Sequence, residues 1–339
     1  MIYTHRINFY FCGDNRSKIL KTNINIQEIE HAAEIISKGG LVAFPTETVY
    51  GLGANALNPV AVAKIFEAKE RPTFDPLIVH ISSLIELEKL TGELDEKVME
   101  LAKRFWPGPL TMVLPKSNLV PDLVTSGLTT VGIRMPDHPV ALELIRRSGC
   151  PIAAPSANKF GQLSPTTAAH VRKQLPHIDY ILDGGKTAVG IESTIVSVEK
   201  DKCVVLRPGR ITPEEIREAL PGTPVESKAQ NDKIVAPGLL KSHYSPKKPL
   251  FILNTESNLP EGSGLILHSN ETTKLNAARI VKTSETRQLL EVASGLFAAL
   301  HTLEDDPEIS QIWIEPVPEI GLGIAIMDRV KKAAYQYQE

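Results

Sequence analysis

The chain has 339 residues, more than the ~250–300 over which one hydrophobic core usually extends, so we expect two domains. Hydrophobic residues make up 42% of it and charged residues 23%, and no apolar run approaches the length of a membrane span. The formal net charge of −3 lacks the basic excess of a general nucleic-acid-binding protein, so we expect direct RNA binding to be weak or absent.

The cysteines and the N-terminal segment indicate the compartment. Cys12, Cys150 and Cys203 are odd in number and follow no metal-binding spacing, which is typical of free thiols in a reducing cytosol. Residues 1–20 contain no continuous apolar segment of the kind found in a signal peptide. We therefore expect a cytoplasmic protein without a membrane partner.

A helix and a strand are predicted first along the chain. Asn25 and Glu28 have the spacing of a capping box, and an apolar stripe at helical intervals continues from them to Gly39. The short apolar run at 41–44 then indicates a buried strand, which a proline ends.

Segment 45–81 predicts a polar loop, a helix, a basic corner and a second strand. An Asn-Pro pair at 58–59 begins a helix that ends near 69–71, and the glycines at 51–53 indicate a wide loop. This order brings polar side chains to the ends of neighbouring elements, where α/β sites are usually built. Those side chains are Thr46, Glu47, Thr48, Lys69, Arg71 and His80. We expect Lys69 and Arg71 at an exposed helix end, either as an anion site or as solvated charges that complement the helix dipole.

Further along, two strands end in polar residues. The strand predicted at 129–135 carries Arg134 at its end, and a buried strand at 151–154 leads into a loop with Ser156 and Asn158. From the residues alone, these two fit equally well as turn residues that satisfy their own backbone. A Ser-Pro pair at 164–165 predicts the start of the next helix.

The composition and the periodicity of the sequence change after residue 222. Residues 223–248 are rich in Pro, Lys, Ser and Gly with little periodicity, which predicts a linker. From residue 249 onward, strands alternate with helices, which is typical of a small α/β domain with a parallel sheet.

Several segments together resemble the YrdC-like family of L-threonylcarbamoyladenylate synthases. They are PTETVYGLG at 45–53, Lys-x-Arg-Pro at 69–72, PLIVHI at 76–81, Ser-x-Asn at 156–158, Gly-x-Glu-Ser-Thr at 190–194, Arg-Pro-Gly at 207–209 and Pro-Gly-x-x-x-x-His-Tyr-x-Pro at 237–246. The last element is typical of the long-form members, which usually have a second histidine where this chain has Ser242.

The resemblance implies an α/β protein with two units. Residues 1–222 would form a YrdC-like catalytic domain around an open, twisted, mixed sheet, and 249–339 a smaller Rossmann-like α/β accessory domain. Between them, 223–248 would be a linker that folds over the active site.

The implied activity is a nucleotidyl transfer. ATP, L-threonine and bicarbonate (or carbon dioxide) would form L-threonylcarbamoyladenylate with release of pyrophosphate, and Mg²⁺ would accompany ATP. The product would serve a downstream transferase that modifies the tRNA adenosine next to the anticodon, as the first step of that modification. Direct tRNA binding is expected to be weak or absent.

The resemblance also implies site residues. Lys69 and Arg71 would be catalytic. The L-threonine site would contain Thr46, Thr48, His80, Arg134, Ala154 and Ser193. The nucleotide site would contain Lys69, Arg71, Asp75, Thr130, Ser156, Asn158, Ser164, Arg207 and Tyr244. Asp75 would either bind magnesium or cap its loop.

Two other functions remain open at this point. The fold has been associated with double-stranded RNA, although the net charge argues against an RNA-binding module. A YrdC-like domain also acts in hydrogenase-maturation carbamoyl transfer, but the acylphosphatase and zinc-finger modules of that system have no counterpart here.

Overall fold

The computed structural model describes residues 25–227, 236–254, 258–269 and 275–337. Cys12 lies outside these ranges, and both described cysteines, Cys150 and Cys203, are free thiols. No helix within these ranges is long and apolar enough to cross a membrane.

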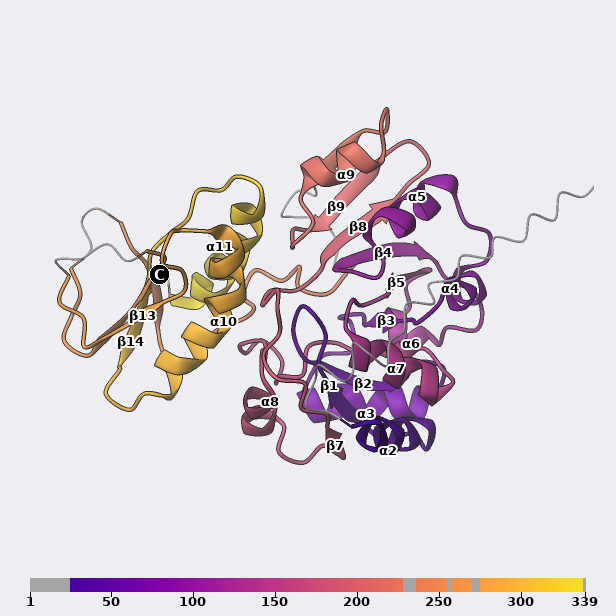
Figure 1. Ribbon diagram of the computed structural model, residues 1–339, viewed down its shortest axis with the longest axis horizontal. Helices are drawn as coiled ribbons and strands as arrows, with labels where there is room; N and C mark the ends of the chain where they lie inside the picture. The colour runs from indigo at the N-terminus through magenta and orange to yellow at the C-terminus, as the bar shows by residue number, and fades with distance from the viewer. Residues whose placement is uncertain (1–24, 228–235, 255–257, 270–274, 338–339) are drawn as a thin grey trace, which may run out of the picture.

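The described part of the N-terminal region forms one mixed, ten-stranded sheet in the order β10-β9-β8-β4-β5-β3-β6-β2-β1-β7 (Figure 1). Its strands are β1 (Val42–Phe44), β2 (Gly51–Asn55), β3 (Ile78–His80), β4 (Leu110–Pro115), β5 (Thr130–Arg134), β6 (Ile152–Ala153), β7 (Tyr180–Ile181), β8 (Thr194–Val198), β9 (Cys203–Arg207) and β10 (Val225–Ser227). The helices packed around it are α2 (Ile26–Ser37), α3 (Pro59–Lys69), α4 (Leu84–Thr91), α5 (Glu96–Phe105), α6 (Asp122–Thr125), α7 (Pro139–Ser148), α8 (Ala168–Gln174) and α9 (Pro213–Ala219).

Side-chain alternation along the strands separates the two faces of this sheet. On one face, Val79 and Ile133 join a large core that also contains the apolar sides of α3, α5 and α9. On the other face, Val42 and Phe44 pack against α2 and α7. Beyond those two helices, the same face continues over β3, β5, β4 and β8, and the candidate site lies there.

Two boundaries predicted from the sequence are wrong. The stretch at 51–53 is not a wide loop but the start of strand β2, where a Cβ at Gly53 would lie 2.7 Å from both Phe44 and Ile152. Glycine is therefore required there by close packing, not by a loop conformation. The helix expected from Ser164 begins instead at Ala168, because the side chain of Thr167 caps it.

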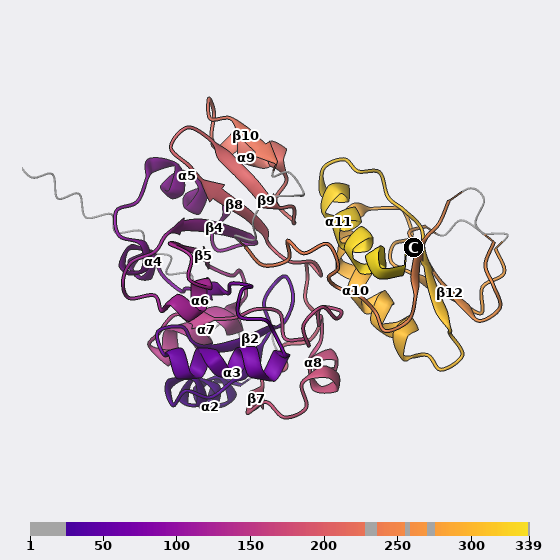
Figure 2. The same ribbon diagram turned by 180° about the vertical axis from the view of Figure 1, so that it is seen from behind.

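The C-terminal region forms a second, smaller α/β unit, and all its strand pairs are parallel, as expected. The sheet has the order β11-β14-β12-β13, with β11 (Leu250–Ile252), β12 (Ser263–Leu267), β13 (Arg279–Lys282) and β14 (Gln311–Ile314). Helices α10 (Leu289–Asp305) and α11 (Leu322–Ala334) and the 3₁₀ turn η1 (Tyr335–Tyr337) complete it. Figures 1 and 2 both show α10 and α11 on the side of this sheet that faces the first unit.

The segment between the units is partly structured. Strand β10, inside the stretch expected to be a linker, extends the first sheet by pairing in parallel with β9. Ala236 then packs against Ile78, Val113 and Ile195 of the first unit.

Candidate active site

A cavity lies over the carboxyl ends of β3 and β5. Because His80 is paired with Arg134 in the parallel register of these strands, both side chains reach the same place. The residues around the cavity are Thr46, Thr48, Val49, Gly51, Arg71, Ile78, His80, Arg134, Ala154, Pro155, Ser156, Glu192, Ser193, Arg207, Pro237, Gly238, His243 and Tyr244.

At one end of the cavity, Arg134 is held beside two hydroxyl groups. Its Nη1 donates to Thr48 Oγ1 over 2.9 Å, and its Nη2 lies 2.6 Å from Glu47 Oε1. The Thr46 hydroxyl donates to the Val49 carbonyl and lies 2.9 Å from the Thr48 hydroxyl. Among the described residues, Arg134 Nε has no hydrogen-bond partner. This end therefore offers a buried guanidinium with a free donor, which suits a carboxylate.

His80 adds a neutral imidazole to the same end. Burial and, to a lesser extent, the charge of Arg134 lower its pKa to about 3, so the ring is uncharged at neutral pH. Its Nδ1 has no hydrogen-bond partner in the described structure. A neutral ring with a free nitrogen can accept from or donate to a bound polar group.

The other end of the cavity carries two more buried arginines. Arg207 donates through Nη2 to the carbonyl of Ser193 over 2.9 Å and to its hydroxyl over 3.2 Å. Arg71 lies 2.9 Å from the Asp75 carboxylate and donates to the Pro76 carbonyl. Asp75 thus braces Arg71 and its own loop, since Arg71 Nε also donates to the Asp75 carbonyl.

Lys69 and Arg71 are not at an exposed helix end, which corrects the expectation from the sequence. Their relative exposures are 1% and 7%. Glu70, the C-cap of α3, adopts a left-handed conformation, and the chain turns there so that the residues on either side of it point inward. Lys69 Nζ donates to the carbonyls of Ser156 and Asn158 and does not line the cavity. Burial, with a smaller contribution from Arg71, lowers the pKa of Lys69 well below its usual value.

Some expected site residues lie just outside this cavity. The Ser164 hydroxyl donates to Glu192 Oε1 over 2.5 Å, and the Asn158 amide donates to the carbonyls of Lys159 and Gln162. Lys69, Asp75 and Ser164 therefore support residues of the cavity wall, and the backbone N–H of Asn158 donates to the carbonyl of Ser156 in that wall. The remaining expected residues, apart from Thr130, form the wall.

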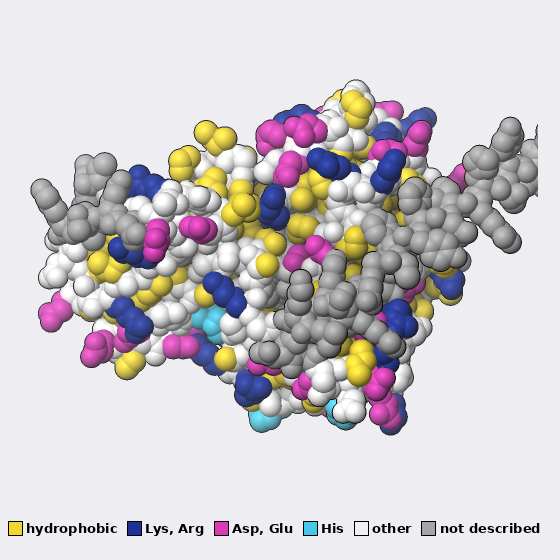
Figure 3. Space-filling view, viewed as in Figure 1, with side chains coloured by type: hydrophobic (Ala, Val, Ile, Leu, Met, Phe, Trp, Pro, Cys, Tyr) yellow, Lys and Arg dark blue, Asp and Glu magenta, His cyan; other side chains and the backbone are white. Residues whose placement is uncertain are grey.

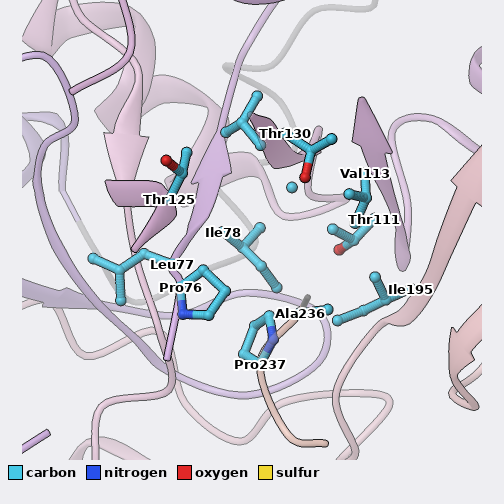
Figure 4. A pocket seen from close by; sticks show the side chains of 12 residues that line it. Pro76, Leu77, Ile78, Thr111, Val113, Thr125, Thr130, Ile195, Ala236 and Pro237 are labelled. Carbon is cyan, nitrogen blue, oxygen red and sulfur yellow. The ribbon is translucent and has the colours of Figure 1, made fainter. Parts of the chain in front are cut away.

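Thr130 lines a second, smaller hollow. Figure 4 shows its hydroxyl and Val113 across from Pro76 and Pro237. Gly132 leaves part of the floor open, because a Cβ there would lie 3.4 Å from Thr111 Cγ2. Ile78 and Pro237 line both hollows, so the two are adjacent.

Several wall residues were not expected from the sequence. No ligand contact was assigned to Glu192, Pro237, Gly238 or His243, although all four lie in segments that carry the family resemblance. The Pro-Gly pair was the available signal: Gly238 has a φ of +78°, and a Cβ there would lie 2.7 Å from Tyr244 Oη.

The cavity suits a polyanionic ligand together with a small carboxylate. Three buried guanidiniums, Arg71, Arg134 and Arg207, surround hydroxyls and a neutral histidine. In the described parts of the chain, no group of three or more His, Cys, Asp or Glu side chains could hold a metal ion. The three guanidiniums are placed to bind and stabilise negative charge.

Known proteins resemble both units of the chain. Residues 34–209 match the family of Sua5, YciO and YrdC proteins, described as "Telomere recombination", and residues 211–335 match "Threonylcarbamoyl-AMP synthase, C-terminal domain". The threonylcarbamoyl-AMP synthase of Bacillus subtilis is 46% identical over 325 residues, which cover 91% of this chain and 94% of the relative. That of Pyrococcus abyssi is 43% identical over 332 residues, covering 92% and 97%.

The fold agrees with these matches. The crystal structure of P. abyssi Sua5 complexed with L-threonine superposes with a TM-score of 0.83 at 40% identity, covering 92% of this chain and 95% of that one. Both the motif-based resemblance and the expected two-unit α/β fold are thereby confirmed. The chain belongs to the Sua5/YrdC family of threonylcarbamoyl-AMP synthases, in the long form that carries the additional C-terminal domain.

Proposed function

We infer that the chain is a threonylcarbamoyl-AMP synthase, which performs the first step of N6-threonylcarbamoyladenosine formation in tRNA. The observation that carries this conclusion is the match over nine-tenths of the chain to synthases, together with a cavity that has buried arginines at both ends. The matching C-terminal domain disfavours the RNA-binding and hydrogenase-maturation alternatives, since that domain is named for the synthase.

L-Threonine is proposed to bind at the Arg134 end. Its carboxylate would pair with the guanidinium, whose Nε is free, and its hydroxyl would contact Thr46 and Thr48. His80, Ala154 and Ser193 would enclose the amine and the methyl group. The P. abyssi structure supports this assignment, because it is a complex with L-threonine.

ATP is proposed to occupy the two adjacent hollows. The nucleoside would enter the smaller one beside Thr130, and the phosphates would lie near Arg71, Arg207, Ser156 and Tyr244 in the larger one. Lys69, Asn158, Ser164 and Asp75 would act through the wall residues that they hold.

The chemistry then requires positioning more than covalent catalysis. The threonine amine, once neutral, bonds to carbon dioxide and loses a proton, which gives a carbamate. A carbamate oxygen attacks the α-phosphorus, the bond to the β-phosphate oxygen breaks, and pyrophosphate leaves with the electron pair; from bicarbonate, one water is also released. Arg71 and Arg207 would stabilise the charge on the phosphates during transfer.

Mg²⁺ is proposed to arrive with ATP as part of the substrate. Asp75, which was expected either to bind magnesium or to cap its loop, is already paired with Arg71 and so fits a bracing role better than a metal-ligand role. Since Mg²⁺ commonly uses substrate phosphates and water as ligands, a dedicated protein cluster is not needed.

The product is proposed to pass to a separate tRNA threonylcarbamoyl transferase in the cytoplasm, where ATP, threonine and tRNA are available. Figure 3 shows Lys and Arg side chains interspersed with Asp and Glu over the visible face, which supports weak or absent direct tRNA binding.

The test is the dependence of pyrophosphate release on both threonine and bicarbonate, with the adenylate identified by mass. Arg134→Gln should raise the KM for threonine about 10–10²-fold, because a hydrogen bond to a charged group contributes about 1.5–3 kcal/mol, while the KM for ATP changes little. Arg217→Gln, which removes an exposed guanidinium, is the matched control and should change neither. Pyrophosphate release without threonine, or driven by carbamoyl phosphate, would contradict the proposed function.

A further inference from the structure

The loop at 189–193 belongs to the catalytic unit but is built into the accessory domain. The Ile191 side chain is fully buried in the core formed by α10 and α11. Gly190 has a φ of +76°, and a Cβ there would lie 2.5 Å from Ser294 Cα on α10. The path of this loop is therefore determined by contact with the other domain.

The next residue, Glu192, presents a carboxylate to the wall of the cavity. It accepts from the Ser164 hydroxyl over 2.5 Å and from Arg329 Nε over 2.8 Å. Burial raises the pKa of Glu192, but the charges of Arg329 and Arg207 outweigh it and hold this pKa below its usual value. A buried negative charge thus lies in the cavity proposed for a polyanionic substrate.

Arg329, on helix α11, contacts two residues of the cavity wall, Glu192 and Tyr244, and the residue that follows a third, Arg207. Besides Glu192, it donates to the Pro208 carbonyl over 2.8 Å, directly after Arg207. Its guanidinium carbon lies 5.4 Å from the centre of the Tyr244 ring, within the range of a cation–π contact. The side chain itself has no exposed surface, so no solvent replaces these partners.

We propose that Arg329 is a positioning residue for the nucleotide: from the accessory domain it neutralises Glu192 and holds Glu192, Tyr244 and the backbone after Arg207 in place. Without it, the buried Glu192 carboxylate would lose its ion-pair partner while it faces the triphosphate. The accessory domain then completes the nucleotide site through its own side chain, in addition to any effect on the linker. This inference rests on the proposed synthase function.

The test separates ATP from threonine in steady-state kinetics. Arg329→Met should raise the KM for ATP at least tenfold and leave the KM for threonine within about threefold. Adding Glu192→Gln in the same chain removes the unpaired carboxylate charge and should recover most of the lost ATP affinity. A merely structural role for Arg329 would give no such recovery, because the second substitution removes one more contact.

Arg279→Met is the matched control, since it breaks an ion pair with Asp306 in the same domain, away from the cavity. It should change neither KM. If Arg329→Met does not fold, Arg329→Lys carries the test: lysine keeps the charge but cannot span all three partners, so the KM for ATP should rise at least threefold. Equal rises in both KM values, an unchanged KM for ATP, or no recovery in the double variant would overturn the proposal.

Failure of the proposed function is distinguishable from failure of this inference. If the wild-type chain makes no threonine-dependent pyrophosphate, the function is wrong. Calorimetric binding of a non-hydrolysable ATP analogue to wild type, Arg329→Met and the double variant then still shows whether Arg329 positions the nucleotide.

Discussion

At the scale of single residues, Lys69 and Arg71 have different positions in the site. Arg71 lines the cavity, while Lys69, one residue before the turn at Glu70, binds the backbone of the 156–158 loop. A buried ammonium that bridges two carbonyls holds this loop against the helix end. We therefore expect Lys69 to contribute to the stability of the fold as well as to turnover.

Lys69→Met should reduce both quantities. Because two buried carbonyls lose their partner, the free energy of unfolding should fall by about 1–3 kcal/mol, and turnover should fall as the Ser156 loop shifts. Urea unfolding and the pyrophosphate assay measure the two effects. Lys64→Met is the control in the same helix: its exposed ammonium binds one carbonyl, that of Gly39, so its effect on both should be small. Lower turnover at unchanged stability would show that Lys69 contacts substrate instead.

At the scale of elements, residues 236–246 form one wall of the cavity. Tyr244 is 1% exposed, has a left-handed φ of 61° and packs against the rings of His243 and Phe297. Its hydroxyl has no partner among the described residues. We propose that this segment covers the adenylate and shields it from water, with the Tyr244 hydroxyl available to the nucleotide.

Two substitutions separate the ring from the hydroxyl. Tyr244→Ala leaves a cavity in a packed region and should cost about 3–5 kcal/mol of stability, with a sharp loss of synthesis. Tyr244→Phe keeps the packing and should preserve the thermal midpoint but raise the KM for ATP several-fold. If Tyr244→Phe has normal kinetics, the hydroxyl does not reach the nucleotide, and the ring acts only as a cover.

At the scale of the whole molecule, the two units meet through buried polar groups as well as apolar ones. His170 of α8 and His301 of α10 stack with ring centres 3.9 Å apart, and His301 Nε2 lies 3.2 Å from the Ser164 carbonyl. Nearby, Lys173 pairs with Glu304 and Asp305 across the same boundary. Burial, followed by the neighbouring His301, lowers the pKa of His170 to about 4, and burial likewise lowers that of His301 to about 4.

These shifts predict an acid-sensitive interface. Both folded-state pKa values lie below the unfolded value of about 6.5, so the unfolded chain binds more protons between these limits. The contribution of the pair is complete above pH ~6.5 and is lost progressively as the pH falls from ~6.5 toward ~4. His301→Phe keeps a ring in the stack but removes its titration, and should therefore lose less of its thermal midpoint between pH 7.5 and 5 than wild type.

The exposed His177→Asn is the control and should follow wild type across this range. Since other groups titrate in all three proteins, the comparison is between slopes and not between single midpoints. An identical slope for His301→Phe and wild type would exclude the pair as the source of acid sensitivity.

Local sequence patterns determined the elements, whereas the assigned residues of the cavity wall were expected from the resemblance to the family. The caps at Asn25 and Asn58 hold the helices that they were expected to begin. Helices and strands can be predicted from such patterns because the patterns depend only on residues two to four positions apart in the sequence.

The tertiary structure decided what covers each of these side chains. Whether Lys69 is solvated or buried depends on a loop almost ninety residues further along the chain, and the Glu192–Arg329 pair joins positions 137 apart. The role of Gly53 follows from Phe44 and Ile152 packing over it, which no local rule reports. Burial and charge pairing depend on contacts between distant segments, so residue type and spacing could indicate an anion site but not which of its cations would face the ligand.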